Sequence, residues 1–337
     1  MNGTAFIAIG RNEGERLIRC LYSLQKVTTN IIYVDSGSTD GSTEFAASLG
    51  ATVVNLDAEE GFTMARGRNA GLKRLLALSP ETEFVHFIDG DCELISEWLS
   101  AALTFITQHP DVAVVCGRRR ERHPENSLYN RLCDIEWNTP IGETYACGGD
   151  ALMRMQALKA TGGFNEELIA GEEPELCSRM RQSGWKIVRM DYDMTLHDAN
   201  ILHLSEWWKR YVRGGYGACD VTTRLPDSEL KRVFGSQIRS AVLWTAGSAL
   251  ILGLATLGSF MFRDGRILLS SFLCVLALWI LQIFRTASFQ YQRAGGLGSS
   301  MSYGLSLMVA KWPQFLGILK YRLDLVSRRK ARLIEYK

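Results

Sequence analysis

The chain has 337 residues, of which 22% are charged and 47% hydrophobic, and its formal net charge is +2. Its length exceeds the roughly 100 to 200 residues of one typical domain, so we expect one full globular domain and an additional part. Because acidic and basic residues nearly balance, the composition gives no reason to expect binding to nucleic acid.

Eight cysteines are spread along the chain without a CxxC pair, and the first residues, MNGTAFIAIGRNEG, lack the charged segment and long apolar run of a signal peptide. These features indicate a reduced, cytosolic compartment. Metal sites made of thiolates favour closely spaced cysteines, so we expect these thiols to be packed in the core or idle.

The first part of the chain alternates short β-type runs with segments whose apolar residues recur at helical spacing, such as EGERLIRCLYSLQ and MARGRNAGLKRLLAL. The expected strands cover residues 4–9, 31–35, 51–56, 84–89 and 112–117. This alternation predicts an α/β fold with a mostly parallel sheet.

Polar loops follow three of these strands, with GRNE after the first, DSGSTDGS after the second and DGDCE after the fourth. Ligands bind beyond the carboxyl ends of such strands, so we expect the loops to form one pocket. Asp89 and Asp91 lie in the third loop, and Gly90 between them lets the backbone turn without a Cβ clash. Paired carboxylates are typical of Mg²⁺ or Mn²⁺ bound with substrate phosphates, whereas a solvated turn is the alternative for so short a motif.

Five segments, in their order and spacing, resemble the GT-A fold glycosyltransferases of family 2. They are FIAIGRNEGERLIRCLYSL, IIYVDSGSTDGS, ARGRNAGL, FIDGDCEL and GGFNEELIAGEEPELCSRMRQSGWKI, and the resemblance covers about residues 4–220. It implies a GT-A nucleotide-sugar-binding domain and a metal-dependent enzyme that inverts the anomeric centre of its donor sugar.

The resemblance also implies donor-binding roles for residues at matching positions. Asp35 is expected to contact the nucleobase and Glu13 the ribose region. The remaining members of the donor-binding set are Arg11, Arg68, Asn69, Asp89 and Trp208. A UDP-sugar is the favoured donor, although Ser36 stands where the family often has a second acid, which leaves the base open. Turn and cap chemistry is the alternative role for Asp35 and Asn69.

The expected metal ligands are Asp89 and Asp91, which match the family's DxD motif, and His197. Asp91 is expected to be the more direct ligand. His197 lies 24 residues after Glu173, a distance at which some family members place a histidine that completes the metal shell. A neutral imidazole together with Asp91 and diphosphate oxygens suits Mn²⁺.

The segment GEEPELCSRM matches the acidic catalytic segment of the family, with Glu173 at the general-base position and Glu172 beside it. The family more often has an aspartate there. The base would take the proton of the acceptor hydroxyl while the metal stabilises the departing diphosphate. Alternatively, the glutamates only favour a helix N-terminus that has Pro174 in its first turn.

The segment SEWWKRYVRGGYG, residues 205–217, combines tryptophans with basic residues. Trp207 and Trp208, with Lys209, Arg210 and Arg213, are expected to close over the donor diphosphate or to meet an acceptor phosphate at the level of the lipid headgroups. An amphipathic helix at a membrane interface is the alternative. The chain lacks the QxxRW signature of processive polysaccharide synthases here, which argues against a channel that translocates a polymer.

Two long uncharged runs, residues 240–262 and 267–284, approach the roughly 20 residues that cross a bilayer. A buried pair of helices in a soluble protein is the alternative. We expect a catalytic domain over 1–235 and a membrane domain over 236–337, in which 294–319 is interfacial or re-entrant. Two spans return the basic tail to the cytosolic side, as the positive-inside rule requires.

The sequence therefore predicts an inverting, metal-dependent glycosyltransferase in the cytoplasmic membrane, with its catalytic domain in the cytosol. It would add one sugar from a nucleotide sugar to a polyprenyl-linked glycan in polysaccharide or cell-envelope glycan biosynthesis. Transfer to a polyprenyl phosphate is the alternative reaction, and a noncatalytic membrane scaffold that binds nucleotide sugars is the alternative from another class.

Overall fold

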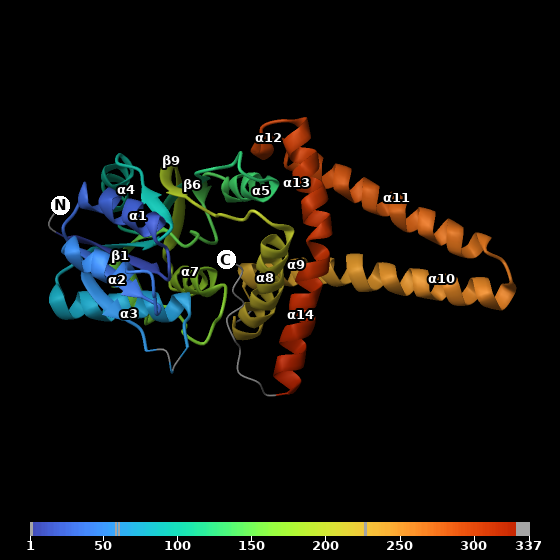
Figure 1. Cartoon of the computed structure of the whole chain (residues 1–337), viewed down its shortest axis with the longest axis horizontal. Helices are drawn as coiled ribbons and strands as arrows, with labels where there is room; N and C mark the ends of the chain where they lie inside the picture. The colour runs from blue at the N-terminus through green and yellow to red at the C-terminus, as the bar shows by residue number, and fades with distance from the viewer. Residues whose placement is uncertain (1–2, 58, 60, 226–227, 328–337) are drawn as a thin grey trace. The chain divides into compact units, whose positions relative to one another are not determined.

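The computed structural model of the chain describes residues 3–57, 59, 61–225 and 228–327 (Figure 1). The chain divides into two compact units, Met1–Leu202 and His203–Lys337. The expected domain boundary at residue 235 stays a prediction.

The first unit is built on one sheet of nine strands. They are β1 (Thr4–Gly10), β2 (Ile31–Asp35), β3 (Thr52–Asn55), β4 (Phe84–Asp89), β5 (Cys92–Leu94), β6 (Val112–Glu121), β7 (Gly142–Glu143), β8 (Ala151–Arg154) and β9 (Lys186–His197). The strand order is β3-β2-β1-β4-β8-β6-β9-β5, and β7 pairs with β9. Strands β3, β2, β1 and β4 are parallel to one another, as are β6 and β9, whereas β8 is antiparallel to both β4 and β6.

Seven helices accompany the sheet in the described part of the first unit. They are α1 (Glu15–Gln25), α2 (Ser42–Ser48), α3 (Met64–Leu78), α4 (Trp98–Gln108), α5 (Leu128–Trp137), α6 (Met155–Thr161) and α7 (Glu172–Gln182). Helix α3 packs on β1 and β2, and α4 packs on β6. The central strand β1 reads as a continuous apolar run because both of its faces are buried in the core.

The expected α/β class is confirmed, and the sheet is mixed. Each of the five expected strands is present, and the strand that begins at Val112 continues to Glu121 instead of ending at residue 117. Strands β5, β7, β8 and β9 are not among the expected ones. They supply the antiparallel pairs of the sheet.

The second unit is helical in its described part. Its helices are α8 (Leu204–Arg224), α9 (Glu229–Val242), the π-helical turn η1 (Leu243–Gly247), α10 (Ser248–Phe262), α11 (Arg266–Phe289), α12 (Tyr291–Ala294), α13 (Leu297–Val309) and α14 (Lys311–Val326). Helices α8 and α14 approach closely, since a Cβ added to Gly215 would lie 2.1 Å from the carbonyl oxygen of Gln314.

Two helices of the described chain, Glu229–Phe262 and Arg266–Phe289, are long and apolar enough to cross a membrane, and 18-residue windows within them have mean hydropathies of 1.7 and 2.5. They contain the two uncharged runs, and α10 and α11 lie side by side as a hairpin in Figure 1. The segment 294–319, expected to be interfacial or re-entrant, falls largely on α13 and α14. Of the basic tail, residues 320–333, the part up to Ser327 is described, and residues 328–333 lie outside the described residues.

Candidate active site

The register of the parallel strands places three polar loops at one edge of the sheet. Gly10, at the end of β1, pairs with Asp35, at the end of β2. On the other side of β1, Ile9 pairs with Asp89, the last residue of β4. The loops after these three strands therefore begin side by side.

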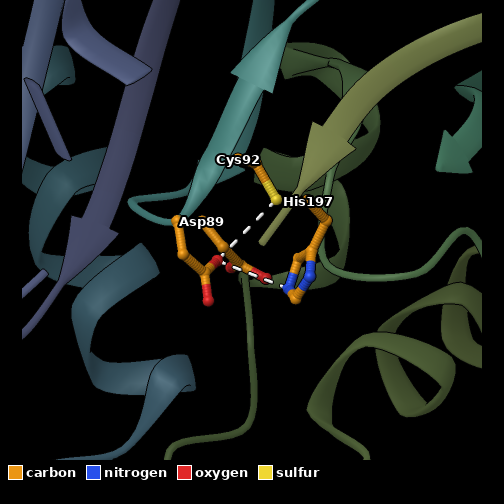
Figure 2. A group of neighbouring side chains, drawn as sticks. Asp89, Cys92 and His197 are labelled. Carbon is orange, nitrogen blue, oxygen red and sulfur yellow. Dashed lines mark hydrogen bonds and ion pairs between the residues drawn. The ribbon is translucent and has the colours of Figure 1, made fainter. Parts of the chain in front are cut away.

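Asp89, Asp91, Cys92 and His197 form a compact group in which one ligand atom from each residue lies within 4.8 Å of the others. Figure 2 shows Asp89, Cys92 and His197 converging on one small volume. Cys92 opens β5 and pairs in register with His197, which ends β9. The His197 Nε2 atom lies 3.4 Å from Asp91 Oδ1, and both residues are buried. The group, called the DxD cluster below, therefore offers two carboxylates, one imidazole and one thiol.

Gly90 lets the DxD loop pack against the end of β1. A Cβ added at Gly90 would lie 3.1 Å from the Ile9 carbonyl oxygen and 3.3 Å from Glu13 Cγ. The Gly90 N–H donates to that same carbonyl at 2.7 Å. A side chain at this position would crowd both atoms, so glycine favours the close backbone approach that places the two flanking carboxylates.

Two arginines face the Asp89 carboxylate. Arg68 Nη2 lies 2.9 Å from Asp89 Oδ1, and Arg119 Nη2 lies 3.6 Å from Asp89 Oδ2. Arg68 also contacts Glu172, with Nη1 2.6 Å from Oε1. Burial raises the pKa of Asp89 although Arg68 opposes the shift. For Arg68, burial works against the charge, but Asp89 and Glu172 outweigh it and raise its pKa.

Asp150 and Arg119 support Asp89, and sequence reasoning did not find either residue. Asp150 Oδ1 accepts the Asp89 N–H at 3.0 Å, and its Oδ2 lies 3.2 Å from Arg119 Nη2. The pKa of Asp150 is lowered, because Arg119 and the hydrogen bonds to this carboxylate outweigh the opposing effect of burial. A Cβ added to Gly149 would lie 2.6 Å from Asp89 Oδ2 and 2.9 Å from Arg119 Nη2. The backbone before β8 is thus fitted tightly around the Asp89 carboxylate.

Glu172 and Glu173 both lie in the first turn of α7, where negative charge favours the helix dipole. Their side chains have different partners. Glu172 pairs with Arg68, whereas Glu173 Oε1 accepts the Cys147 N–H and, at 3.1 Å, the Cys177 thiol. Burial raises the pKa of Glu173. A carboxylate with a raised pKa is a stronger base, which is useful for accepting a proton near neutral pH.

Asp35 binds the backbone of its own turn, as the turn alternative describes, whereas Asn69 lies inside α3 and bonds to residues far away in the chain. Asp35 Oδ2 accepts the N–H groups of Gly37 at 2.8 Å and Ser38 at 2.7 Å. Asn69 donates 2.8 Å bonds to the Phe164 carbonyl and to Glu166 Oε1, and thereby holds the loop that leads to α7. Their expected contacts with a donor stay predictions.

The other residues expected to bind the donor have contacts apart from the group around Asp89. Glu13 Oε2 is 2.7 Å from Arg16 Nη2, and the Arg11 guanidinium lies over the Phe62 ring at 5.2 Å from its centroid. Trp208 belongs to α8 in the second unit. The structure therefore brings together Asp89, Asp91, His197, Arg68 and Glu172 as one connected set, with Glu173 adjacent in sequence to Glu172.

Residues 6–162 match the family model described as glycosyl transferase family 2. The chain is similar to the O-antigen chain rhamnosyltransferase WbaN of Salmonella anatum, with 25% identity over 215 residues, 59% of this chain and 67% of that protein. It is also similar to the pre-mycofactocin glycosyltransferase of Mycobacterium tuberculosis, with 25% identity over 291 residues, 80% of this chain and 59% of that protein. The matched region thus spans 59% to 67% of these two relatives.

Among solved structures, the chain resembles the mannosyltransferase PcManGT of Pyrobaculum calidifontis, which was determined in complex with GDP-Man and Mn²⁺. The TM-score is 0.60 at 14% identity, and the match covers 96% of this chain and 87% of that one. At this identity the likeness shows a shared fold.

Proposed function

Because this chain is a glycosyltransferase with a family 2 domain, we propose that it transfers one sugar from a nucleotide sugar, with inversion, to a polyprenyl-linked glycan. The observation that carries the proposal is the Arg68 guanidinium. It is 1% exposed and contacts both Asp89 of the DxD cluster and Glu172 of α7. It thereby joins the acidic loop proposed for the donor to the acidic helix proposed for the acceptor.

The donor atoms of the DxD cluster fit a hard divalent cation, Mn²⁺ or Mg²⁺. Mg²⁺ and Mn²⁺ prefer oxygen and imidazole ligands to thiols, so the carboxylates and the imidazole are the proposed ligands and the Cys92 thiol is not. Asp91 and His197 would be the direct ligands, since Asp89 already faces two arginines. The Mn²⁺ of the mannosyltransferase complex supports this proposal. When bound, the cation would neutralise the charge of the departing diphosphate.

Glu173 is proposed as the general base that takes the proton of the acceptor hydroxyl. Its contacts with the Cys147 N–H and the Cys177 thiol hold one carboxylate oxygen in place. Its raised pKa suits it to receive a proton. Glu172 is then a positioning residue, because its carboxylate is held by Arg68. The proton passes from the acceptor oxygen to Glu173 as that oxygen attacks the anomeric carbon.

The donor is proposed to be a UDP-sugar that contacts Arg11, Glu13, Asp35, Arg68 and Asn69, with Trp208 closing over the diphosphate. Asp35 ends β2 at the same edge of the sheet as Asp89, which is where ligands of parallel sheets bind. The mannosyltransferase neighbour binds GDP-Man, so a GDP-sugar is the donor to test beside it.

Membrane association is proposed from the second unit. Large apolar side chains are exposed along α10 and α11, among them Leu257, Phe260 and Phe272. Exposed apolar surface of this length is costly in water and is matched by the interior of a bilayer. A two-span topology would keep the first unit in the cytosol, where nucleotide sugars are made. The O-antigen relative supports a role in cell-envelope polysaccharide synthesis.

The proposal is tested by incubating the full-length protein with a panel of nucleotide sugars, Mn²⁺ and a lipid extract, and measuring released nucleotide. We expect release from one donor, dependent on lipid and on metal. Asp91→Asn should abolish it, while Asp191→Asn, a matched change at an exposed carboxylate, should not. Absence of release with every donor would instead support the noncatalytic scaffold. A lipid product with one phosphate and one sugar would identify polyprenyl phosphate as the acceptor.

A further inference from the structure

Cys147, Glu173 and Cys177 form a second buried group of potential metal ligands, called the thiol cluster below. One ligand atom from each residue lies within 4.8 Å of the others. The two Sγ atoms are 3.7 Å apart, and Cys177 Sγ is 3.1 Å from Glu173 Oε1. The cysteines are 30 residues apart in the chain, so their spacing gives no sign of a shared site.

We propose that the thiol cluster binds one soft divalent cation of the zinc type. In a tetrahedral site with Zn–S bonds of about 2.3 Å, two sulfur ligands lie about 3.8 Å apart. The observed separation of 3.7 Å already matches that edge, so the sulfurs need no large movement. The Glu173 carboxylate is the third ligand, and a water molecule completes the four positions that zinc prefers.

Binding requires both thiols to lose their protons, which pass to the solvent, and no electron is transferred. The cation then holds two thiolates and one carboxylate. In the metal-free protein the bond with Cys147 lowers the pKa of Cys177, but burial and the neighbouring Glu173 carboxylate together outweigh it and raise that pKa to about 11. The thiols are therefore neutral until a metal displaces their protons.

The two clusters are expected to select different metals. The DxD cluster offers two carboxylates and an imidazole beside one thiol, a set dominated by ligands that suit Mg²⁺ and Mn²⁺, whereas the paired thiols of the thiol cluster favour softer ions such as Zn²⁺. Excess Mg²⁺ competes with zinc for the first site but not for the thiols of the second. This difference allows the two sites to be measured separately.

Zinc in the thiol cluster should inhibit sugar transfer, because a carboxylate bound to the metal cannot accept a proton from the acceptor. This consequence rests on the proposed role of Glu173 as the base. The binding of zinc does not depend on that role, so it can be measured without an assay of sugar transfer.

The test uses full-length protein kept reduced with a phosphine in excess Mg²⁺, and zinc per chain is measured by equilibrium dialysis. Co²⁺ replaces zinc in a parallel titration, since cobalt bound to thiolate gives a charge-transfer absorption band. The variants are Cys147→Ala and Cys177→Ala. The control is Cys133→Ala, which removes an equally buried thiol outside both clusters.

We expect one zinc per chain and a thiolate band that falls to about half in each single variant but stays unchanged in Cys133→Ala. If either variant fails to fold, protection of wild-type Cys147 and Cys177 from alkylation by zinc gives the same information. A band that persists in both variants, or that disappears in Cys92→Ala, would overturn the assignment. Zinc binding with undiminished transfer would instead count against Glu173 as the base, where at least about a tenfold loss is expected.

Discussion

Replacing Arg68 with methionine should destabilise the first unit strongly. Arg68 is 1% exposed, and its guanidinium makes contacts of 2.9 Å with Asp89 and 2.6 Å with Glu172. Methionine fills much of the volume but leaves both carboxylates without this cation. Removing one partner of a buried ion pair typically costs about 3 to 5 kcal/mol, because the remaining charge stays buried.

Two features of the structure change that loss in opposite directions. Arg119 lies 3.6 Å from the other Asp89 oxygen and continues to offset part of its charge, so the two contacts should not add in full. The substitution also removes the cation–π contact of the Arg68 guanidinium with the Phe164 ring, whose centroid is 5.5 Å away. For a unit of about 200 residues, each kcal/mol lowers Tm by about 2 to 4 °C, which gives a decrease of about 6 to 20 °C.

The decrease should depend on pH in a defined direction. Burial already raises the pKa of Asp89, and the loss of Arg68 removes a cation that opposes this shift. The folded variant then binds a proton more readily than the unfolded chain, so its stability rises as pH falls. The gap in Tm between wild type and variant should be narrower at pH 5 than at pH 8 when thermal unfolding is followed by tryptophan fluorescence.

Arg120→Met is the matched control, since Arg120 Nη1 pairs with Asp193 Oδ2 at 3.1 Å and both side chains are about half exposed, at 53% and 43%. An exposed pair contributes at most about 1 kcal/mol, so the control should stay close to wild type. Adding Glu172→Gln to Arg68→Met removes one uncompensated charge and should recover part of the loss. A Tm for Arg68→Met equal to that of the control would refute the reasoning.

Four further outcomes are expected. Asp91→Asn should abolish turnover without unfolding the protein, and excess chelator should do the same to wild type; activity that survives the chelator would remove the metal from the proposal. Glu173→Gln should keep donor affinity but slow transfer by about 10² to 10⁴, whereas Glu172→Gln should keep more of its rate; reversed behaviour would make Glu172 the base. Gly149→Ala, whose methyl would meet Asp89 Oδ2 at 2.6 Å, should weaken activation by Mn²⁺ by about 10- to 100-fold, while Gly3→Ala, with 4.0 Å of clearance, should not. A thiol added at the C-terminus should resist an impermeant reagent in intact cells; efficient labelling would contradict the two-span topology.

The sequence predicts the parallel half of the sheet well because each strand there is a short apolar run ended by turn residues. Strands β2 and β4 have the expected bounds, and Asp89 lies at the end of β4 as expected. The paired carboxylates are recognisable for the same reason, since they follow an apolar strand directly. These features depend on residues that are near one another in the chain.

The supports of the site could not be predicted, because they depend on pairings between distant segments. Strand β8 has only four residues, and its antiparallel pairing with β4 places Asp150 beneath the Asp89 N–H. Arg119 lies on a strand whose pairing with β9 has register shifts on either side of Arg118, so alternation alone does not give its direction. The thiol cluster is hidden in the same way, since only folding brings Cys147 to Cys177.

The long separations within the site have a consequence for the order in which the protein is made. Arg68 and Glu172 are 104 residues apart, and Arg19 contacts Asp198 across 179 residues. Strands β1 to β4 can pair while the ribosome is still adding the rest of the chain. The DxD cluster can form only after β9 has been made, because His197 ends that strand. A nascent chain released before His197 would hold a partly formed sheet with unpaired acidic loops. Completion of the site therefore coincides with the end of synthesis of the first unit, just before the apolar helices emerge.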